Sequence, residues 1–406
     1  MRRNCRNKIL EITTIKVRKG YMTKKTIKTA IIGSGMMGVQ HALALRRIPG
    51  VEVVAICDPV SKNLAEKAES LGIPYAYSNI EKMLEEQQPD VIHNCTPNSE
   101  HYKISKLALE KGVAVYSEKP LGVSVEEAQS LIALAEKNHT ANGVNFNYRS
   151  NAMVREMRAR LRRGTPGKVL LVHGQYVQDW LMYDTDFNWR VDSRIGGKSR
   201  TVADVGSHWF DTIQLILDAR IEAVYAKLLT VYKQRKRSLV ETQTFSNASG
   251  GAYELVDVDT EDAGFIMVRF ADGTYGNIVL SQVSGGYKNS FTVSVDCANY
   301  SMQWDQESPD KLQIGDRNVG SIKVLSAAGG NTDDANAYTT LPAGHAVGWA
   351  DALTNNINLF YTAIKNGTAN EEKQEYATFR DAAYIMKIVD ACLRSNEEDK
   401  WIEVKE

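Results

Sequence analysis

The sequence lacks an excess of charge and any long apolar run. Its 49 Lys and Arg residues balance 49 Asp and Glu residues, so the formal net charge at pH 7 is zero. Nucleic acids and anionic membrane surfaces attract basic patches, and a balanced charge argues against both as partners. No apolar stretch approaches the roughly 18 residues of a membrane span. We therefore expect neither nucleic acid nor membrane among the partners.

Cysteine is scarce, and its positions are scattered. The chain contains Cys5, Cys57, Cys95, Cys297 and Cys392, with no C-x-x-C pair among them. An odd, dispersed set argues against a disulfide framework and against a zinc site, and it suits a reducing compartment. We therefore expect a cytoplasmic protein without a bound metal.

Residues 1–25 are rich in Lys and Arg but have no long apolar core, so they do not resemble a secretory signal. A mitochondrial presequence is one alternative. Another is an over-extended start, with Met22 as the true first residue. We predict a disordered or non-native extension and exclude it from the fold.

A glycine motif stands between a predicted strand and a predicted helix. Residues 27–32 form an apolar run, and residues 39–47 have the pattern of a helix. In this context, glycines at G-x-G-x-x-G spacing provide a tight turn, close approach of the backbone to a pyrophosphate, and close packing of the helix on the sheet. The N-terminus of the helix would hold the phosphates through its free N–H groups and its dipole. The motif consists of Gly33, Ser34, Gly35, Met36, Met37 and Gly38.

An acidic residue follows the next predicted strand at the expected distance. Residues 51–57 end at Asp58, which stands about 20 residues beyond Gly38, where a ribose-binding acid is expected. Its carboxylate would accept hydrogen bonds from the adenosine ribose and repel a 2′-phosphate, so we expect NAD rather than NADP. The alternative is an ordinary strand–turn–helix in which Asp58 caps the turn before Pro59.

The first half repeats one unit, a strand followed by a helix, with short connections. This alternation predicts an α/β Rossmann domain, a doubly wound parallel sheet covered on both faces. Ligands bind beyond the carboxyl ends of such strands, so one crevice should gather Gly33, Asp58, Thr96 and Lys119. The predicted strands are residues 27–32, 51–57, 74–77, 91–95, 113–116 and 143–148, and the predicted helices are residues 39–47, 61–70, 80–88, 101–111 and 124–138.

Further residues follow the fourth and fifth predicted strands. Glu118-Lys119-Pro120 ends the fifth, and the fourth is followed by Thr96, Pro97, Asn98 and, soon after, His101. Together with the glycine motif and Asp58, these residues resemble the dinucleotide-binding half of the Gfo/Idh/MocA oxidoreductases, named for glucose-fructose oxidoreductase and inositol dehydrogenase. The resemblance implies that Glu118 and Lys119 border the nicotinamide ribose, with the Lys119 ammonium reaching the reacting substrate oxygen. The alternative is a solvated charge pair before a turn proline.

The second half of the chain has a different pattern. β-rich runs follow one another without intervening helices, and residues 271–274 have a hairpin signal. We predict an NAD-binding domain over residues 26–148, followed over residues 149–406 by an α+β domain with a large, mainly antiparallel open sheet that binds substrate and mediates oligomerisation. The predicted strands are residues 169–180, 223–232, 263–270, 275–283 and 291–296, the predicted loops are residues 238–251 and 331–338, and the predicted helices are residues 152–163 and 372–395. We expect the last helix to return to the first domain.

A second motif lies on a predicted helix of residues 201–217. Asp204, His208 and Asp211 stand at i, i+4 and i+7, so they would share one stripe of a largely apolar helix. Buried ionisable groups need partners, so this stripe should face a polar partner or a cavity. Taken singly, the three residues would be a helix-start acid, a satisfied core histidine and an ion pair. Together with Gly206 they resemble the second signature of the same family. A metal site is a further alternative, but no third ligand stands at matching spacing.

By this resemblance, Lys119, Asp204 and His208 are the catalytic residues. Oxidising an alcohol needs a base for its hydroxyl proton, and histidine has the unperturbed pKa nearest neutrality. Lys119 would hydrogen-bond the same oxygen and stabilise negative charge on it. Asp204 would orient His208 or bind a neighbouring substrate hydroxyl.

Other side chains are candidates for the same site. Trp189-Arg190 resembles a pair that meets the nicotinamide end of the cofactor in related reductases, and the alternative is a stacked surface pair. Asn147 and Tyr287 are weaker candidates of the same kind. Aromatic and amide groups suit a hydroxyl-rich ring, and the candidates are Gln178, Trp180 and Tyr183.

These expectations converge on an NAD(H)-dependent oxidoreductase that transfers a hydride between nicotinamide and a CH–OH or C=O group of a sugar, polyol or glycoside. Two alternatives come from the same family. Some members hydrolyse glycosides by transient oxidation with a retained cofactor, and others are non-catalytic sensors. The catalytic residues argue against the sensor. The resemblance also implies a homodimer or a homotetramer.

Overall fold

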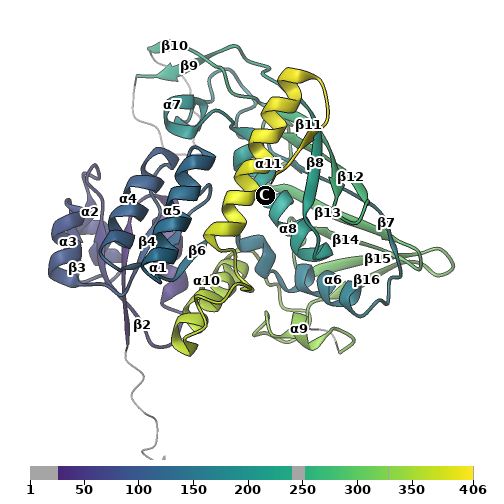
Figure 1. The fold of residues 1–406 in the computed structure, drawn as a ribbon, viewed down its shortest axis with the longest axis horizontal. Coiled ribbons are helices and arrows are strands. Elements are labelled where there is room, and N and C mark those ends of the chain that lie inside the picture. Colours follow the sequence, from purple (N-terminus) through teal and green to yellow (C-terminus); the bar gives the residue numbers. More distant parts are fainter. Residues whose placement is uncertain (1–25, 240–251, 328, 406) are drawn as a thin grey trace, which may run out of the picture.

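The computed structural model describes residues 26–239, 252–327 and 329–405. The predicted extension and most of the predicted loop at 238–251 lie outside these residues. In the described part, two sheet-bearing parts lie side by side, with helix α11 (Phe379–Glu398) between them (Figure 1). None of the helices in the described ranges has both the length and the apolar character needed to cross a membrane.

The first sheet has parallel strands in the order β3-β2-β1-β4-β5-β6. This order, with helices between successive strands, confirms the predicted doubly wound Rossmann arrangement. The order reverses between β1 and β4, which opens a crevice at their carboxyl ends. The strands are β1 (Ile27–Ile32), β2 (Val51–Cys57), β3 (Tyr75–Tyr77), β4 (Val91–Asn94), β5 (Ala114–Ser117) and β6 (Asn142–Val144), and the helices are α1 (Met36–Leu45), α2 (Leu64–Ser70), α3 (Ile80–Gln87), α4 (Asn98–Glu110) and α5 (Val125–Lys137).

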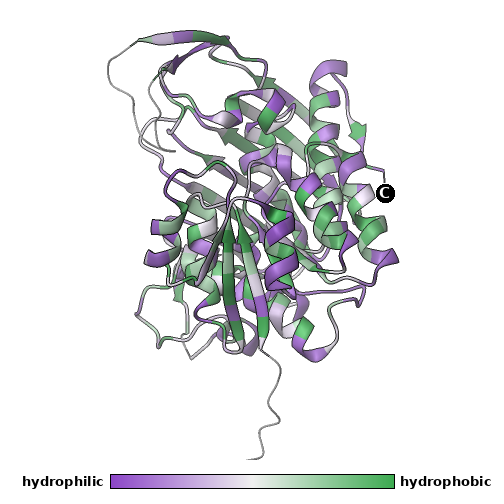
Figure 2. Ribbon diagram, turned by 90° about the vertical axis from the view of Figure 1, so that its left-hand side faces the viewer, coloured by the Kyte–Doolittle hydropathy of each residue, from purple (hydrophilic) through white to green (hydrophobic). Residues whose placement is uncertain are grey.

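The central strands of this sheet are apolar because both of their faces are covered. β4 is buried along its whole length, and β1 is buried except at Lys28. Figure 2 shows apolar residues along these strands. The polar exceptions are paired: Thr29 Oγ1 and His93 Nε2 lie 2.7 and 3.0 Å from the Tyr361 hydroxyl.

The second sheet has the order β16-β15-β14-β13-β7-β12-β11-β8-β17, and only β7 and β12 pair in parallel. The predicted mainly antiparallel sheet and the hairpin at residues 271–274 are confirmed. Strands after β13 were not predicted. The strands are β7 (Val169–Val177), β8 (Ile221–Leu229), β11 (Ala263–Phe270), β12 (Tyr275–Ser281), β13 (Ser290–Cys297), β14 (Ser301–Asp305), β15 (Lys311–Asp316), β16 (Gly320–Leu325) and β17 (Ile402–Glu403), with a separate hairpin of β9 (Gln234–Ser238) and β10 (Tyr253–Asp257).

Shorter helices connect these elements. Residues 331–338, predicted as a loop, contain α9 (Asp333–Asn336), because the Thr332 side chain caps it by accepting from the Ala335 N–H. β6 ends before the predicted residue 148, and a 3₁₀ helix follows it. The remaining helices are η1 (Asn147–Ser150), α6 (Ala152–Arg162), η2 (Trp189–Val191), α7 (Ser193–Gly196), η3 (Val202–Gly206) and α8 (Ser207–Leu217).

Two C-terminal helices return to the first sheet. α10 (Trp349–Asn366) was not predicted, and its Phe360 and Tyr361 lie in one core cluster with Ile31 of β1. α11 contacts α5 and β6 of the first sheet as well as α8 and β8. It begins later than the predicted residue 372, at a capping box formed by Thr378 and Asp381. The end of the chain therefore fixes the two sheets relative to each other.

Phe360→Ala should destabilise the first sheet. The ring is fully buried, and its centroid lies 5.2, 5.6 and 5.4 Å from those of Tyr116, Tyr361 and Tyr376. Removing a buried Phe costs about 3–5 kcal/mol. We expect the free energy of unfolding in urea, followed by circular dichroism, to fall by that amount. The control is Asn358→Ala on the exposed side of the same helix; equal values for the two variants would contradict this role of α10.

Candidate active site

One cavity of about 790 Å³ joins the carboxyl ends of the first sheet to the second half of the chain. It brings together most of the predicted site residues. The first half contributes Gly33, Gly35, Met36, Met37, Asp58, Thr96, Pro97, Asn98, His101, Glu118, Lys119, Asn145 and Asn147. The second half contributes Tyr148, Tyr176, Gln178, Trp180, Trp189, Arg190, Asp204, His208, Asn289 and Trp349.

The glycines shape the loop between β1 and α1. A Cβ on Gly38 would lie 1.9 Å from the Gly33 carbonyl oxygen, so glycine is required for α1 to pack this closely, although Gly38 does not line the cavity. Gly33 has a φ of +97°, which favours glycine. Gly35 differs, because no atom lies within 4 Å of its Cβ position. Open space at this glycine is what close approach of a pyrophosphate requires.

The N-terminus of α1 opens onto the same space. Its N-cap is Gly35, and no side chain caps the first turn. The first N–H groups therefore remain available to a bound anion, and the helix dipole favours negative charge there. Met36 and Met37 of this turn line the cavity. The loop thus fits a dinucleotide pyrophosphate.

Asp58 lies at the end of β2 and faces the glycine loop. Its Oδ2 accepts from the N–H and the hydroxyl of Ser34 at 2.9 and 2.7 Å, which turns Ser34 away from the cavity. Its Oδ1 accepts from the N–H groups of Val60 and Ser61, both at 3.1 Å. Burial opposes ionisation of the carboxyl, but these hydrogen bonds outweigh it and lower the pKa. Asp58 is therefore a fixed negative charge beside the loop.

The loop after β4 is tied to its neighbours. The ring nitrogens of His101 lie 2.5 Å from the Pro120 carbonyl oxygen and 2.8 Å from that of Thr96. Asn98 Nδ2 donates to the Gly196 carbonyl oxygen at 2.9 Å. His101 therefore links the loops after β4 and β5, and Asn98 links the first of them to α7 in the second half.

Glu118 is a buried carboxylate within a hydrogen-bonded group. Its Oε1 accepts from Asn145 Nδ2 at 2.6 Å and lies 2.9 Å from His41 Nε2. Behind it, the Nδ1 atoms of His41 and His93 lie 2.7 Å apart. Burial raises the pKa of Glu118, but the hydrogen bond and charge of His41, with Asn145 and Lys119, bring it to about 2. Glu118 is therefore ionised at the cavity wall.

The two halves of the chain meet in an ion pair. Lys119 Nζ, after β5, donates to Asp204 Oδ1 at 2.7 Å and to the Asp204 carbonyl oxygen at 2.8 Å. Arg190 Nε lies 3.5 Å from the same Oδ1, and Gln282 Nε2 donates to Oδ2 at 3.0 Å. Burial raises the pKa of Asp204, but the charges of Lys119 and Arg190 outweigh it and hold the pKa well below its usual value. The carboxylate and the ammonium are thus fixed beside the cavity.

The predicted helix over residues 201–217 is present, but its first turn is wider than an α-helix. Val202–Gly206 form a π-helical turn, η3, in which the Ser207 N–H bonds to the Val202 carbonyl oxygen, and α8 follows. Such wide turns occur often at functional sites. A Cβ on Gly206 would lie 2.8 Å from Leu280 Cδ1, so glycine lets this turn pack on β12. Local sequence patterns carry no signal for a π turn, because it depends on this packing.

Of the predicted stripe, Asp204 and His208 line the cavity, and Asp211 instead has a polar partner. It is buried, and its Oδ2 accepts from Arg149 Nε at 2.9 Å, with a second contact between Arg149 Nη2 and Oδ1. The alternative of an ion pair therefore holds for this residue. In the described residues, no group of three or more His, Cys, Asp or Glu side chains is placed to hold a metal ion.

His208 is held by packing rather than by hydrogen bonds. Its ring makes edge contacts with Phe146 and Tyr148, with centroids 5.7 and 4.9 Å away. Its Nδ1 is buried and has no hydrogen-bond partner in the part of the chain that the structure describes. Burial and the charge of Lys119 lower the pKa of His208 to about 3. The imidazole is therefore neutral at neutral pH.

A polar and aromatic wall of the cavity contains the predicted Gln178 and Trp180. It also contains Tyr148, Tyr176 and Asn289, which the sequence reasoning missed. The hydroxyls of Tyr148 and Tyr176 lie 3.0 Å apart, and Tyr176 donates to Asn289 Oδ1 at 2.7 Å. Asn289 Nδ2 lies 3.1 Å from the Tyr148 hydroxyl, and Gln178 Nε2 donates to Asn289 Oδ1 at 3.1 Å. These residues come from separate elements, so no local motif marks them.

The remaining candidates divide into two groups. Trp189 and Arg190 line the cavity, with the guanidinium 4.3 Å from the indole centroid, and Asn147 lines it with a buried Nδ2 that has no described partner. Tyr183 and Tyr287 do not line it, and their side chains are 57% and 47% exposed. Both stand in turns that carry the rings into solvent.

Comparison with known families matches both halves of the chain. Residues 27–146 match an oxidoreductase family with an NAD-binding Rossmann fold, and residues 154–300 match the GFO/IDH/MocA C-terminal domain. Levoglucosan dehydrogenase of Pseudarthrobacter phenanthrenivorans is 24% identical over 403 residues, which cover 94% of this chain and 98% of that protein. D-glucoside 3-dehydrogenase of Escherichia coli is 26% identical over 200 residues, which cover 49% of this chain and 56% of that protein.

Solved structures share the fold. An inositol dehydrogenase homolog from Azotobacter vinelandii, complexed with NAD+, has a TM-score of 0.81 at 22% identity and covers 93% of this chain and 97% of its own. Levoglucosan dehydrogenase in complex with NADH and levoglucosan has a TM-score of 0.81 at 23% identity, with 94% and 100% covered. The two family matches span the glycine loop, Lys119, Asp204 and His208. This chain therefore belongs to the Gfo/Idh/MocA family of oxidoreductases.

Proposed function

We propose that the protein is an NAD-dependent dehydrogenase that oxidises an alcohol group of a sugar, polyol or glycoside, or reduces the corresponding carbonyl. One observation carries the proposal. Lys119 from the first half and Asp204 and His208 from the second lie around a single cavity that also contains the dinucleotide loop. An alcohol oxygen at this place would meet an ammonium and a neutral imidazole together.

The residues of the first half fit the cofactor. The open space at Gly35 and the uncapped start of α1 suit the pyrophosphate, and Asp58 suits the adenosine ribose. When bound, NAD accepts the hydride from the substrate carbon. We propose that the nicotinamide end is held by Thr96, Pro97, Asn98, Glu118, Lys119, Asn147, Trp189 and Arg190, with His101 fixing the loops that carry them.

The proposed proton chemistry uses His208 and Lys119. A general base must be unprotonated, and the lowered pKa of His208 keeps the imidazole neutral throughout the neutral range. The same shift makes the imidazole a weaker base than a histidine with its ordinary pKa, so the proposed proton transfer relies on Lys119 to lower the pKa of the alcohol. The Lys119 ammonium would stabilise negative charge developing on the alcohol oxygen. Asp204 would fix the ammonium through the 2.7 Å contact.

The proposed substrate class follows from the cavity wall and from the relatives. Tyr148, Tyr176, Gln178, Trp180 and Asn289 offer aromatic faces and amide groups, which suit stacking and hydrogen bonding to a hydroxyl-rich ring. The similar proteins include dehydrogenases of levoglucosan and of D-glucosides. They also include glucose-6-phosphate 3-dehydrogenase of Bacillus subtilis, 25% identical over 248 residues. Together these names support a carbohydrate substrate for the present chain.

A panel of sugars, polyols and glycosides tests the proposal, with release of NADH followed by absorbance. A dehydrogenase releases NADH in stoichiometric amounts with oxidised product. A glycoside hydrolase that retains its cofactor gives product without net NADH, and a sensor gives neither. Binding of panel members without any oxidation would reject the dehydrogenase.

We also propose a reducing compartment, such as the cytoplasm. Cys57, Cys95, Cys297 and Cys392, the described cysteines, are all free thiols. Burial raises the pKa of the Cys57 thiol to about 12, and burial also raises that of Cys392. Thiols kept protonated in this way are slow to oxidise.

His208→Ala should lower kcat by about 10²-fold to 10⁴-fold, because it removes the proposed base. The dissociation constant of NAD, measured by calorimetry, should be unchanged, since His208 belongs to α8 and not to the glycine loop. His345→Ala provides the control, because His345 is exposed and does not line the cavity. Turnover of His208→Ala close to that of the control would reject the assignment.

Asp58 should make NAD the better cofactor. Its ionised carboxylate would repel a 2′-phosphate, so we expect kcat/KM for NAD to exceed that for NADP by about tenfold or more, equivalent to about 1.4 kcal/mol. Asp58→Ser should reduce this ratio, while Asp334→Ser on the exposed face of α9 should leave it unchanged. Equal use of the two cofactors by the unmodified chain would show that the carboxylate does not select.

We further propose that the outer face of the second sheet joins two copies in a homodimer or within a homotetramer. Phe265 and Met267 of β11 are 53% and 44% exposed, and the strand register places them opposite Val279 of β12 and Tyr225 of β8. Leu171 of β7, 43% exposed, extends this apolar face. Contiguous apolar surface of this kind is typical of an interface.

Phe265→Asp combined with Met267→Lys should give a monomer, because charges would replace the apolar centre of this face. Sedimentation velocity measures the mass of the assembly at micromolar concentration. Leu43→Lys, at a residue of α1 that is 42% exposed, should leave the assembly intact. An unchanged mass for the double variant would place any interface elsewhere.

A further inference from the structure

Gln282 stands directly behind Asp204. It follows β12, its side chain is fully buried, and it does not line the cavity. Its Nε2 donates to Asp204 Oδ2 at 3.0 Å, and its backbone N–H donates to the Asp262 carbonyl oxygen at 2.9 Å. Gln282 therefore touches the proposed catalytic carboxylate from the side opposite the cavity.

The amide of Gln282 can face Asp204 in only one orientation. A carboxylate accepts hydrogen bonds and donates none, so the NH₂ group must face Asp204 and the amide oxygen must face away. The amide oxygen then meets the Thr201 hydroxyl at 3.3 Å, and this hydroxyl also donates to the Glu261 carbonyl oxygen at 2.7 Å. The hydroxyl has a single proton and its shorter contact is to Glu261, so the amide is held chiefly by the hydrogen bond from its NH₂ group to Asp204.

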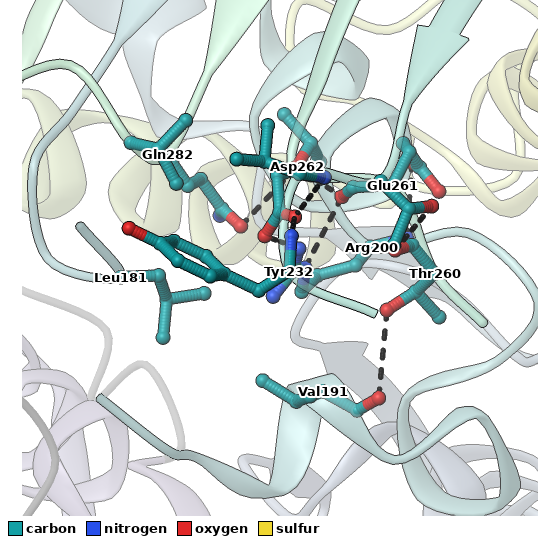
Figure 3. Close-up of polar contacts among 12 residues, drawn as sticks. Leu181, Val191, Arg200, Tyr232, Thr260, Glu261, Asp262 and Gln282 are labelled. Atoms are coloured by element: carbon teal, nitrogen blue, oxygen red, sulfur yellow. Dashed lines mark hydrogen bonds and ion pairs between the residues drawn. The ribbon is translucent and has the colours of Figure 1, made fainter. Parts of the chain in front are cut away.

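Gln282 lies among hydrogen-bonded residues that include Glu261, Asp262 and Arg200, as Figure 3 shows. Glu261 Oε1 accepts from the N–H groups of Arg200 at 3.1 Å and Val202 at 2.8 Å, where η3 begins. Asp262 is fully buried and pairs with the Arg200 guanidinium. Because the same two acidic residues hold the start of η3 and the end of β12, Gln282 and Asp204 keep a constant separation.

The two oxygens of Asp204 have different partners. Oδ1 accepts from Lys119 at 2.7 Å, and Oδ2 accepts from Gln282 at 3.0 Å. With both oxygens held, the plane of the carboxylate is fixed. Without Gln282, the Asp204 carboxylate would be less restrained in its rotation. The Lys119 ammonium that it binds would then be positioned less well.

We propose that Gln282 is a positioning residue that locks the Asp204 carboxylate so that Lys119 presents its ammonium to the reacting oxygen. The inference rests on the proposed function of Lys119 and Asp204. A buried amide with a structural role alone would affect the stability of the protein, whereas a positioning residue also sets the turnover of the folded enzyme. Turnover per folded molecule and its pH dependence separate the two roles.

Gln282→Met is the first variant, because methionine keeps the length of glutamine and removes its hydrogen bonds. Losing a bond to a charged group should lower kcat by about tenfold or more. The dissociation constant of NAD should stay within about twofold, since Gln282 does not line the cavity. Gln313→Met provides a matched control, because Gln313 is an exposed glutamine of β15. Unchanged kcat in folded Gln282→Met would overturn the proposal.

Gln282→Glu is the second variant, and it keeps the proposal testable if the first does not fold. The new carboxyl would face Asp204, with Lys119, Arg190 and His208 on the cavity side. Two facing carboxylates share a proton at low pH, and the protonated group then donates to Asp204 as the amide does. The ratio of variant to wild-type kcat should therefore rise towards one as pH falls, and drop about tenfold or more as pH rises. A ratio independent of pH would overturn the proposal.

Both variants are compared with the unmodified enzyme on the best substrate of the panel. An active wild type with an equally active Gln282→Met would remove the positioning role and leave the dehydrogenase function intact. A wild type that oxidises no member of the panel with NAD would reject the proposed function, and the positioning role with it.

Discussion

The ion pair between Lys119 and Asp204 is the contact on which the arrangement of the site depends. The side chains are only 13% and 20% exposed, and removing two charges from water costs several kcal/mol that their attraction rarely recovers in full. Stability alone does not account for such a pair. The pair lies at the wall of the cavity, between two halves of the chain with separate sheets, as the catalytic role that we propose for it requires.

An ion pair between two halves has a constant geometry only if the halves do not move relative to each other. The C-terminal helices supply this condition. α10 buries Phe360 and Tyr361 against the first sheet, and α11 lies between α5 and the second sheet. Lys119 itself follows β5 directly, and Asp204 stands on a π turn packed on β12. Neither residue depends on a long loop, so the scaffold positions both charges.

The sequence predicted those features whose signals are local. The glycine loop, Asp58 and Glu118-Lys119-Pro120 follow strands with strong apolar runs. The parallel first sheet and the mainly antiparallel second sheet were both predicted. α10 was missed because its apolar residues pack on a sheet far away in the chain. The π turn and the pairing of Asp211 with Arg149 were missed for the same reason, since each depends on tertiary contacts. Tyr148, Tyr176 and Asn289 meet only after the strands of the second half have paired.

The charges at the substrate end of the cavity are largely paired with one another. In the described ranges, the cations that line this end are Lys119 and Arg190, and both lie beside the Asp204 carboxylate. Glu118 is ionised, and the hydrogen bond and charge of His41 help to keep it so. A phosphate or carboxylate on a substrate would compete with Asp204 for its two cations. A hydroxyl group can instead donate to the carboxylate and accept from the ammonium without separating them, so this ion pair is compatible with the polyhydroxyl substrate that we propose.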